Sequence, residues 1–251
     1  QSDAVPSLGS RVKNYLRIKN PSCVAYDVVF GCPGWLEGVI QAQAFIKAGM
    51  AKKCLVIGAE TLSRVVDIHD RDSMIFSDGA GATIIEKMED EHDNGIIAHE
   101  SATYATDEAF YLTFEASYNQ ELKRETRYIK MNGRKIYNFA LSYVPQAMKN
   151  CLDKSGYGID EINKIFIHQA NEKMDQAICE RFYKLYEKEM PEHVMPMSIA
   201  ELGNSSVATL PTLLDLVKKN QLENQHIEKG DVVIFASVGA GMNINALVYK
   251  I

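Results

Sequence analysis

The chain has 251 residues, of which 46% are hydrophobic and 24% charged, a balance that indicates an ordinary globular protein and excludes a disordered one. The formal net charge is −6, and Lys and Arg are dispersed, so the sequence lacks the basic footprint of a nucleic-acid-binding protein. No apolar run has the length needed to cross a bilayer, and the first ten residues do not resemble a signal peptide. We therefore expect a cytoplasmic protein that binds neither nucleic acid nor membrane.

The apolar pattern predicts an α/β fold, because short β-rich runs alternate with amphipathic stretches. Several of these runs are continuously apolar, as in strands of a sheet that is covered on both faces. In chain order we expect a helix at 7–16, a strand at 26–30, a helix at 33–48, strands at 53–58, 82–86 and 95–99, a long ordered loop at 103–130, a helix at 134–155, a strand at 164–168, helices at 172–189 and 205–220, and strands at 231–237 and 243–249.

The two parts of the chain differ in completeness. The part from residue 95 onward alternates strands and helices and ends in two strands, whereas the part before it contains fewer elements. If the protein is a duplication, the first half lacks an opening strand, a helix and a second strand. Sheet edges and helix faces would then stay uncovered unless an N-terminal piece exists elsewhere. The loop at 103–130 is a candidate for the substrate entrance, a subunit contact or a plain surface excursion.

The five cysteines are an odd number, are widely spaced and form no CxxC pair or Cys/His cluster, so we expect neither a disulfide framework nor a metal site. Cys32 has a special context, because GCPGW joins a strand pattern to an amphipathic helix. Pro33 suits the first helical position, which places the sulfur at a helix N-terminus, where cysteine pKa values can fall to about 3.5–7.5. A buried structural cysteine is the alternative, but this context favours a nucleophile.

A cysteine nucleophile needs a proton shuttle or hydrogen-bond donor nearby. His168 ends the apolar run KIFIH and precedes QANEKM, so it lies where a strand meets a helix, the place where α/β folds present ligand-binding groups. An equally good alternative is that His168 is a buried structural residue whose ring nitrogens are hydrogen-bonded within the protein. The other histidines lie in polar or loop-like surroundings, where a solvated role is expected; they are His69, His92, His99, His193 and His226.

Two turns of small residues complete the candidate site. In LGNSSVA, residues 202–208, Asn204 is either a helix N-cap or the donor of a side-chain amide toward a thioester carbonyl. In SVGAGM, residues 237–242, small residues allow backbone N–H groups to approach a reacting carbonyl, as an oxyanion hole requires.

Five motifs together resemble a known family. They are GCPGW at Cys32, FSDGAGA at 76–82, IHQAN at 167–171, GNSS at 203–206 and VGAG at 238–241. Their ordered set, over nearly the whole chain, looks like β-ketoacyl-acyl-carrier-protein synthase III of the thiolase superfamily. The resemblance implies a thiolase-like α/β fold of two similar halves, each with a mixed sheet, layered α/β/α/β/α. Residues 1–94 are then an incomplete half that lacks its N-terminal segment and carries the nucleophile, and residues 95–251 carry the His and the Asn.

The resemblance also implies residue roles. Cys32, His168 and Asn204 correspond to a Cys-His-Asn triad, in which Cys32 takes an acyl group from coenzyme A while His168 and Asn204 hold the thioester carbonyl of malonyl-acyl-carrier protein. The backbone N–H groups of Cys32 and Ala240 correspond to the oxyanion hole. Asn171 matches a residue that contacts pantetheine, and Arg71 matches one that lies against the coenzyme A nucleotide. A helix cap or a surface charge is the alternative for these last two.

The function expected from the resemblance is a decarboxylative Claisen condensation of an acyl-CoA with malonyl-acyl-carrier protein, in a homodimer, with coenzyme A thioesters as substrates and no cofactor. The product starts a fatty acid or enters a secondary-metabolite pathway. Two alternatives stay open: a non-condensing acyltransferase on the same fold, which would acylate Cys32 without decarboxylating malonyl thioesters, and a non-catalytic partner subunit. Retention of all three triad residues argues against the partner subunit.

Overall fold

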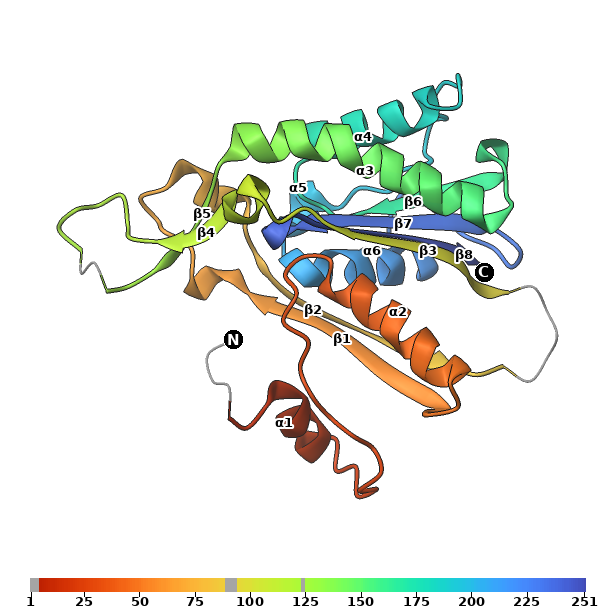
Figure 1. Ribbon diagram of the computed structural model, residues 1–251, viewed down its shortest axis with the longest axis horizontal. Coiled ribbons are helices and arrows are strands. Elements are labelled where there is room, and N and C mark those ends of the chain that lie inside the picture. The colour runs from red at the N-terminus through yellow and green to blue at the C-terminus, as the bar shows by residue number, and fades with distance from the viewer. Residues whose placement is uncertain (1–4, 89–93, 123–124) are drawn as a thin grey trace. The chain divides into compact units, whose positions relative to one another are not determined.

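The computed structural model describes residues 5–88, 94–122 and 125–251, which fall into two units, residues 1–30 and 31–251 (Figure 1). His92, expected to have a solvated role, lies outside the described residues. No described helix is long and apolar enough to cross a membrane.

Residues 5–30 of the first unit contain one helix, α1 (Leu8–Tyr15), which is N-capped by the Ser7 side chain. The Asp27 carboxylate accepts hydrogen bonds from the backbone N–H groups of Leu8 and Gly9, at 2.8 and 2.7 Å. The strand predicted at 26–30 is wrong, because these residues form no regular element in the structure. An apolar extended pattern becomes a strand only when a neighbouring strand pairs with it, and among the described residues none does.

The second unit is built on a mixed four-stranded sheet in the order β3 (Gly95–Thr103), β8 (Asn243–Lys250), β7 (Val232–Gly239) and β6 (Ile162–Ile167). The pair β6 and β7 is parallel, and the other pairs are antiparallel. All residues of β7 are buried, as its unbroken apolar sequence predicts for a strand covered on both faces.

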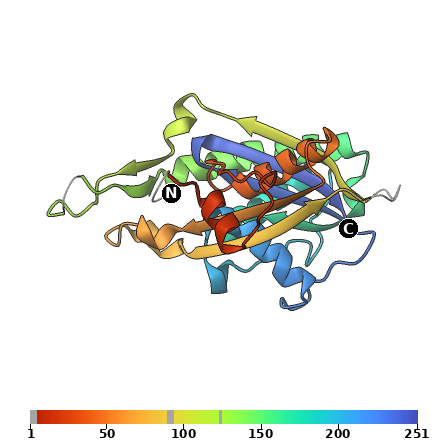
Figure 2. The same ribbon diagram turned by 90° about the horizontal axis from the view of Figure 1, so that it is seen from below.

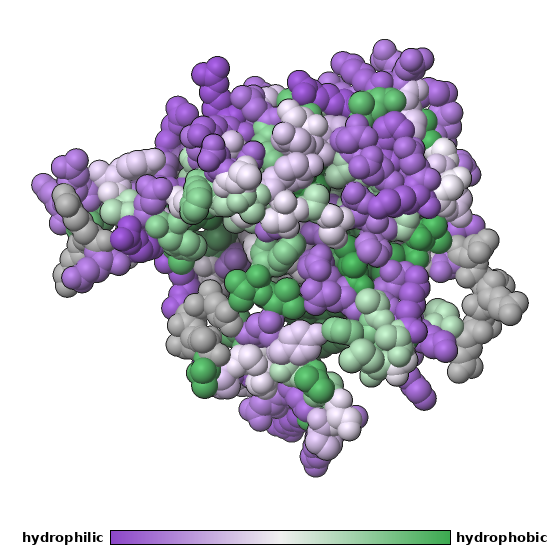
Figure 3. All heavy atoms as spheres, viewed as in Figure 1, coloured by the Kyte–Doolittle hydropathy of each residue, from purple (hydrophilic) through white to green (hydrophobic). Residues whose placement is uncertain are grey.

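Helices cover both faces of this sheet (Figure 1). On one face lie α3 (Gly133–Ser155) and α4 (Glu172–Lys184), which share a large apolar core with the sheet. On the other lie α2 (Gly34–Lys47) and α6 (Thr209–Lys218), where Trp35 packs on Phe235, with a distance of 5.9 Å between ring centroids. Figure 3 shows mainly hydrophilic residues on the outer surface of α3 and α4, as amphipathic helices require.

The antiparallel pair β1 (Lys53–Thr61) and β2 (Asp78–Glu86) packs on the other side of α2 and α6 (Figures 1 and 2). Two glycines permit close approach: an added Cβ would lie 2.5 Å from the Val207 carbonyl oxygen at Gly58 and 2.6 Å from the Pro211 Cβ at Gly81. The FSDGAGA motif therefore continues into β2, and the absence of a side chain at Gly81 allows the first turn of α6 to pack against this strand. The helices α2 and α6 thus lie between two sheets, which confirms the layered α/β arrangement.

The predicted loop at 103–130 is partly wrong, because it contains a hairpin of β4 (Leu112–Glu115) and β5 (Tyr128–Met131). The hairpin projects from the rest of the second unit (Figures 1 and 2). Residues 123–124 lie outside the described residues. The remaining short helices are η1 (Leu62–Arg64), η2 (Arg71–Ile75), η3 (Asp107–Phe110), η4 (Ile159–Glu161), α5 (Ile199–Leu202), η5 (Ser206–Ala208) and η6 (Ala240–Met242).

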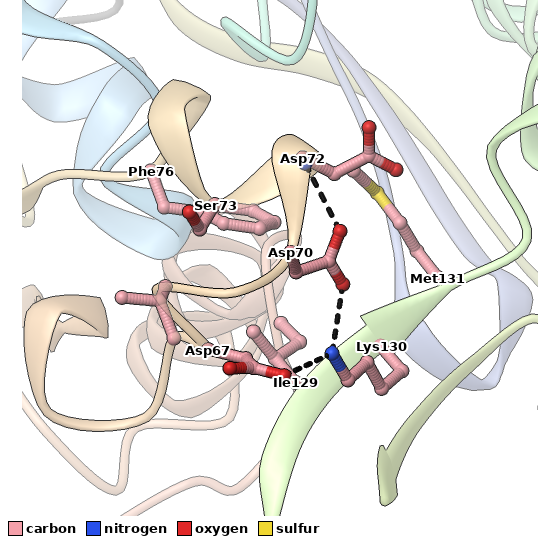
Figure 4. A pocket seen from close by; sticks show the side chains of 9 residues that line it. Asp67, Asp70, Asp72, Ser73, Phe76, Ile129, Lys130 and Met131 are labelled. Carbon is pink, nitrogen blue, oxygen red and sulfur yellow. Dashed lines mark hydrogen bonds and ion pairs between the residues drawn. The ribbon is translucent and has the colours of Figure 1, made fainter. Parts of the chain in front are cut away.

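A buried ion cluster ties β5 to the segment around η2 (Figure 4). The Lys130 ammonium lies 2.6 Å from the Asp67 carboxylate and 2.9 Å from that of Asp70, and its side chain is only 5% exposed. The same ammonium lies 3.5 Å from the centre of the Tyr118 ring. Asp70 also accepts a hydrogen bond from the Asp72 N–H and so caps η2.

The charges of this cluster are stabilised by hydrogen bonds. Burial alone would raise the pKa of Asp67, but hydrogen bonds from Lys130, from the N–H groups of Tyr118 and His69 and from Ser117 hold it well below its ordinary value. Burial would lower the pKa of Lys130, but the two carboxylates raise it. The stabilisation from Asp67 is therefore lost as pH falls below about 4, and that from Lys130 only as pH rises above about 10.

Replacing Lys130 by Met should destabilise the protein by about 3–5 kcal/mol at pH 7, because two buried carboxylates lose their counter-charge. The difference in free energy of unfolding from the unmodified protein should be largest between about pH 5 and 9 and should shrink below about pH 4, as Asp67 becomes protonated. Urea unfolding at several pH values measures it. Lys53→Met is the control, since its ion pair with Glu86 is half exposed and should cost less than about 1 kcal/mol. Equal losses in both variants would contradict a buried, charged cluster.

Replacing Gly58 by Ala should destabilise the protein by about 1–3 kcal/mol, because the new methyl group collides with the Val207 carbonyl. Denaturant unfolding measures the loss. The matched control is Gly133→Ala at the first residue of α3, where an added Cβ meets nothing within 4 Å and Ala favours the helix. A Gly58→Ala variant as stable as the control would show that the strand and the turn can separate without cost.

Candidate active site

Cys32 lies immediately before α2. The helix begins at Gly34 with Pro33 as its N-cap, so the sequence placed Pro33 one residue too far into the helix. Gly31 has φ = 73°, a left-handed conformation that turns the chain into the helix. Cys32 is half-buried, and its sulfur lies at the N-terminal end of α2 as predicted.

The expected lowering of the Cys32 pKa is not found. Burial raises the pKa of this thiol, and the nearby Glu60 carboxylate acts in the same direction, while hydrogen bonds from the Ser206 hydroxyl and the backbone lower it. The physical reason is that loss of hydration disfavours a thiolate more than the donors around it favour one.

The turn at residues 204–209 connects the predicted triad. Asn204 is held in place by a short β-bridge, in which its N–H donates to the Ile75 carbonyl at 2.8 Å and its carbonyl accepts from the Ser77 N–H at 3.0 Å. Its side-chain Oδ1 accepts the Ser206 N–H at 2.8 Å. The Nδ2 group has no acceptor among the described residues. Asn204 is therefore not the N-cap of α6, and its amide N–H₂ is free to serve a ligand.

Ser206 follows in a left-handed backbone conformation, with φ = 54°. For a residue with a Cβ this conformation costs about 1–2 kcal/mol. Its hydroxyl donates a hydrogen bond to the Cys32 sulfur, with 3.4 Å between Oγ and Sγ. The turn that carries Asn204 therefore also contacts the candidate nucleophile.

His168 follows β6 directly and is 2% exposed. Its Nδ1 lies 2.7 Å from the Thr209 hydroxyl, and that hydroxyl lies 3.0 Å from the Ser206 carbonyl oxygen. Burial lowers the pKa of His168 to about 4, so the imidazole is neutral at pH 7. The structure thus links all three predicted triad residues through residues 204–209.

The loop between β7 and β8 packs against the nucleophile. A Cβ added at Gly239 would lie 2.9 Å from the Cys32 Cβ and 3.0 Å from its backbone nitrogen, so only glycine fits here. The next residue, Ala240, lies close to Gly31. Among the described residues the Cys32 N–H donates to no backbone carbonyl, and the backbone hydrogen bond to the Cys32 sulfur comes from Cys32 itself. The residues of the predicted oxyanion hole are therefore neighbours.

A cavity of about 470 Å³ opens beside Asn204. Its walls come from residues 74–77, 170–172 and 199–203. Asn171 lines it and also N-caps α4 through its side-chain oxygen, so the helix-cap alternative is found, while its Nδ2 has no acceptor among the described residues. Arg71 is exposed at the start of η2 and does not line this cavity.

The sequence did not assign roles to Ser206, Thr209 or Lys130. The first two lie in or next to the GNSS motif, but which neighbours their hydroxyls reach depends on the turn's conformation. The signal for Lys130 was a single charged residue within an apolar strand pattern, YIKM. The described residues contain no cluster of three or more His, Cys, Asp or Glu that could hold a metal ion.

Two family models match the chain. The model for 3-oxoacyl-[acyl-carrier-protein] synthase III covers residues 26–105, and the model for the C-terminal part of the same synthase covers residues 152–251. The first contains Cys32, and the second contains His168, Asn204 and Ala240. The matched regions are therefore those that build the candidate active site.

Known proteins resemble the whole chain. A β-ketoacyl-[acyl-carrier-protein] synthase III of Porphyra umbilicalis is 34% identical over 250 residues, which is 96% of this chain and 73% of that protein. Synthase III 2 of Staphylococcus epidermidis is 32% identical over 94% of this chain and 69% of its own length. The solved synthase III of Thermus thermophilus has a TM-score of 0.85 at 28% identity, covering 100% of this chain and 74% of its own. The chain is thus shorter than these relatives, and it belongs to the β-ketoacyl-[acyl-carrier-protein] synthase III family.

Proposed function

We propose that this chain condenses an acyl group from acyl-CoA with malonyl-acyl-carrier protein, releasing carbon dioxide and giving 3-oxoacyl-carrier protein. The observation that carries the proposal is the turn at 204–209, whose residues contact both Cys32 and His168 and present the Asn204 amide. Membership of the synthase III family supports the same chemistry. A pure scaffold subunit would not need a reactive thiol linked in this way.

The first half-reaction is acylation of Cys32. Cys32 loses its proton, and the thiolate attacks the acyl-CoA carbonyl carbon and expels the coenzyme A thiolate. The coenzyme A thiolate takes up a proton, which balances the one that Cys32 lost. The developing oxyanion needs two N–H donors, and the backbone groups of Cys32 and Ala240 are the proposed pair. The close packing of Gly239 on Cys32 supports this role, because it keeps the loop next to the reacting carbon.

The second half-reaction is decarboxylation of the malonyl thioester. Loss of carbon dioxide leaves an enolate, whose oxygen is stabilised by the Asn204 Nδ2 group and by His168 Nε2–H. A neutral imidazole suits this task, because an imidazolium would protonate the carbanion, and His168 is neutral at pH 7. The carbanion then attacks the acyl-Cys32 carbonyl and releases the Cys32 thiolate.

Thr209 sets which ring nitrogen of His168 carries the proton. The Thr209 hydroxyl lies within hydrogen-bond distance of both Nδ1 and the Ser206 carbonyl, which also accepts the Thr209 backbone N–H. In this proposal the single hydroxyl proton goes to Nδ1. With Nδ1 acting as acceptor, the neutral ring carries its proton on Nε2, as the enolate step requires. Thr209 is therefore a positioning residue in this proposal.

The cavity beside Asn204 is the proposed approach for the pantetheine arm, with Asn171 as a contact. Arg71 is the proposed contact for the coenzyme A nucleotide, and the Lys130 cluster that holds η2 would fix its backbone. The proposed reaction requires no cofactor, since cleavage of the malonyl carboxylate itself supplies the carbanion. The homodimer that the sequence resemblance implies and the cytoplasmic location stay predictions, and sedimentation tests the homodimer.

Incubation with acetyl-CoA and longer acyl-CoAs should add one acyl group to Cys32, visible by intact mass and peptide mapping. Addition of malonyl-acyl-carrier protein should then discharge it as a 3-oxoacyl product. Cys32→Ala should abolish the adduct. Asn204→Ala should retain it and slow discharge by about a hundredfold or more, because a donor to the enolate is lost.

The other outcomes separate the alternatives. Acylation without discharge by malonyl-acyl-carrier protein indicates a non-condensing acyltransferase. Full turnover by the Cys32→Ala variant would exclude both enzymatic functions and leave the partner subunit. No adduct on Cys32 from any acyl-CoA contradicts the proposed first half-reaction of this chain.

Replacing Thr209 by Val should leave acylation of Cys32 unchanged and slow malonyl discharge by about ten- to a hundredfold, since the Nε2–H tautomer loses its support. Single-turnover measurements of the two half-reactions give the comparison. Thr209→Ser keeps the hydroxyl and should discharge faster than the Val variant. Equal discharge by the Val variant and the unmodified protein would show that Thr209 does not set the tautomer.

A further inference from the structure

We propose that Ser206 is a further catalytic residue, whose hydroxyl stabilises the Cys32 thiolate. The inference rests on the proposed role of Cys32 as nucleophile. Ser206 Oγ donates to Cys32 Sγ at 3.4 Å, and among the described residues no other side chain forms a hydrogen bond with this sulfur. The turn therefore serves the nucleophile as well as the enolate.

The backbone at Ser206 indicates that its side chain is needed. With φ = 54°, the residue adopts a conformation that glycine tolerates and other residues do not favour. Two hydrogen bonds hold it there, one from its N–H to Asn204 Oδ1 and one to its carbonyl from the Thr209 backbone N–H. Glycine would satisfy this backbone without strain, so what serine adds is the hydroxyl that reaches the sulfur.

The surroundings of the sulfur explain why such a donor matters. Removal of water disfavours a thiolate, and the charged or titratable groups on the surrounding elements do not compensate. Glu60 on β1 is acidic, Glu37 on α2 binds Asn245, and His168 is neutral. A hydrogen bond from a neutral hydroxyl favours the thiolate without adding a positive charge.

The reaction places negative charge on this sulfur twice. In acylation the S–C bond forms from the thiolate as the coenzyme A thiolate leaves. In condensation the new C–C bond forms, carbon dioxide is lost and the S–C bond breaks, so the sulfur leaves with its electron pair. A donor held at the sulfur lowers the energy of the charged form before the first step and after the second.

The test measures thiol ionisation and needs no acyl substrate. Iodoacetamide alkylation of Cys32 is followed by peptide mass between pH 6 and 10 in the full chain, in Ser206→Ala and in Ser206→Gly. Ser205→Ala is the matched control, because Ser205 is equally buried but its hydroxyl does not contact Cys32. Alkylation of the half-buried Cys54 in each sample reports any general change in exposure.

Both Ser206 variants should shift the pH midpoint of Cys32 alkylation upward by about one to two units. At pH 7 the rate of Cys32 alkylation should fall by about three- to tenfold, because a smaller fraction of the thiol is ionised. The fall is smaller than the loss of thiolate, since a more basic thiolate is also more nucleophilic. Ser205→Ala and the Cys54 rates should not change. An unchanged midpoint in both variants overturns the proposal, and so does a shift in Ser206→Ala that Ser206→Gly lacks, because the effect would then come from the backbone. If the two Ser206 variants show the predicted midpoint shifts but the unmodified protein transfers no acyl group, only the proposed function is contradicted.

Discussion

The contact between Gly58 of β1 and the Val207 carbonyl is the constraint on which the candidate active site depends. It allows the turn at 204–209 to lie directly on the β1–β2 pair, with Gly81 making the same allowance for Pro211. The bridge from Asn204 to residues 75–77 fixes the other side of this turn. A turn held on two sides by backbone contacts can keep a left-handed serine, which would otherwise relax.

The buried polar groups of the site form a small hydrogen-bonded network. His168, Thr209, Ser206 and Cys32 are joined by side-chain and backbone hydrogen bonds, although each is removed from bulk water to some degree. Burial keeps the imidazole neutral and makes the thiolate harder to form, so the same desolvation favours one step of the proposed reaction and opposes the other. In the proposed reaction, the Ser206 hydroxyl stabilises the Cys32 thiolate and the Thr209 hydroxyl keeps the His168 proton on Nε2.

Much of the fold could be predicted from the chain's periodicity. The apolar runs that became β6, β7 and β8 were recognisable because both of their faces are covered, and Cys32 and His168 were recognisable because each lies where a strand pattern meets a helix pattern. The strand at 26–30 was wrong because pairing is not a local property. The β4–β5 hairpin was missed because its strands are short, and the partners that hold it, such as Asp67 for Lys130, are distant in sequence.

The sequence by itself determined the α/β alternation and indicated Cys32, His168 and Asn204 as candidate site residues, because periodicity and motif order are local properties of the chain. Only the tertiary structure decided how these residues are connected and how they are charged. Which hydroxyl reaches the Cys32 sulfur depends on the left-handed turn at Ser206, and the direction of the thiol pKa depends on how much water the packed site removes. Both are set by contacts between segments far apart in sequence, which local patterns do not encode.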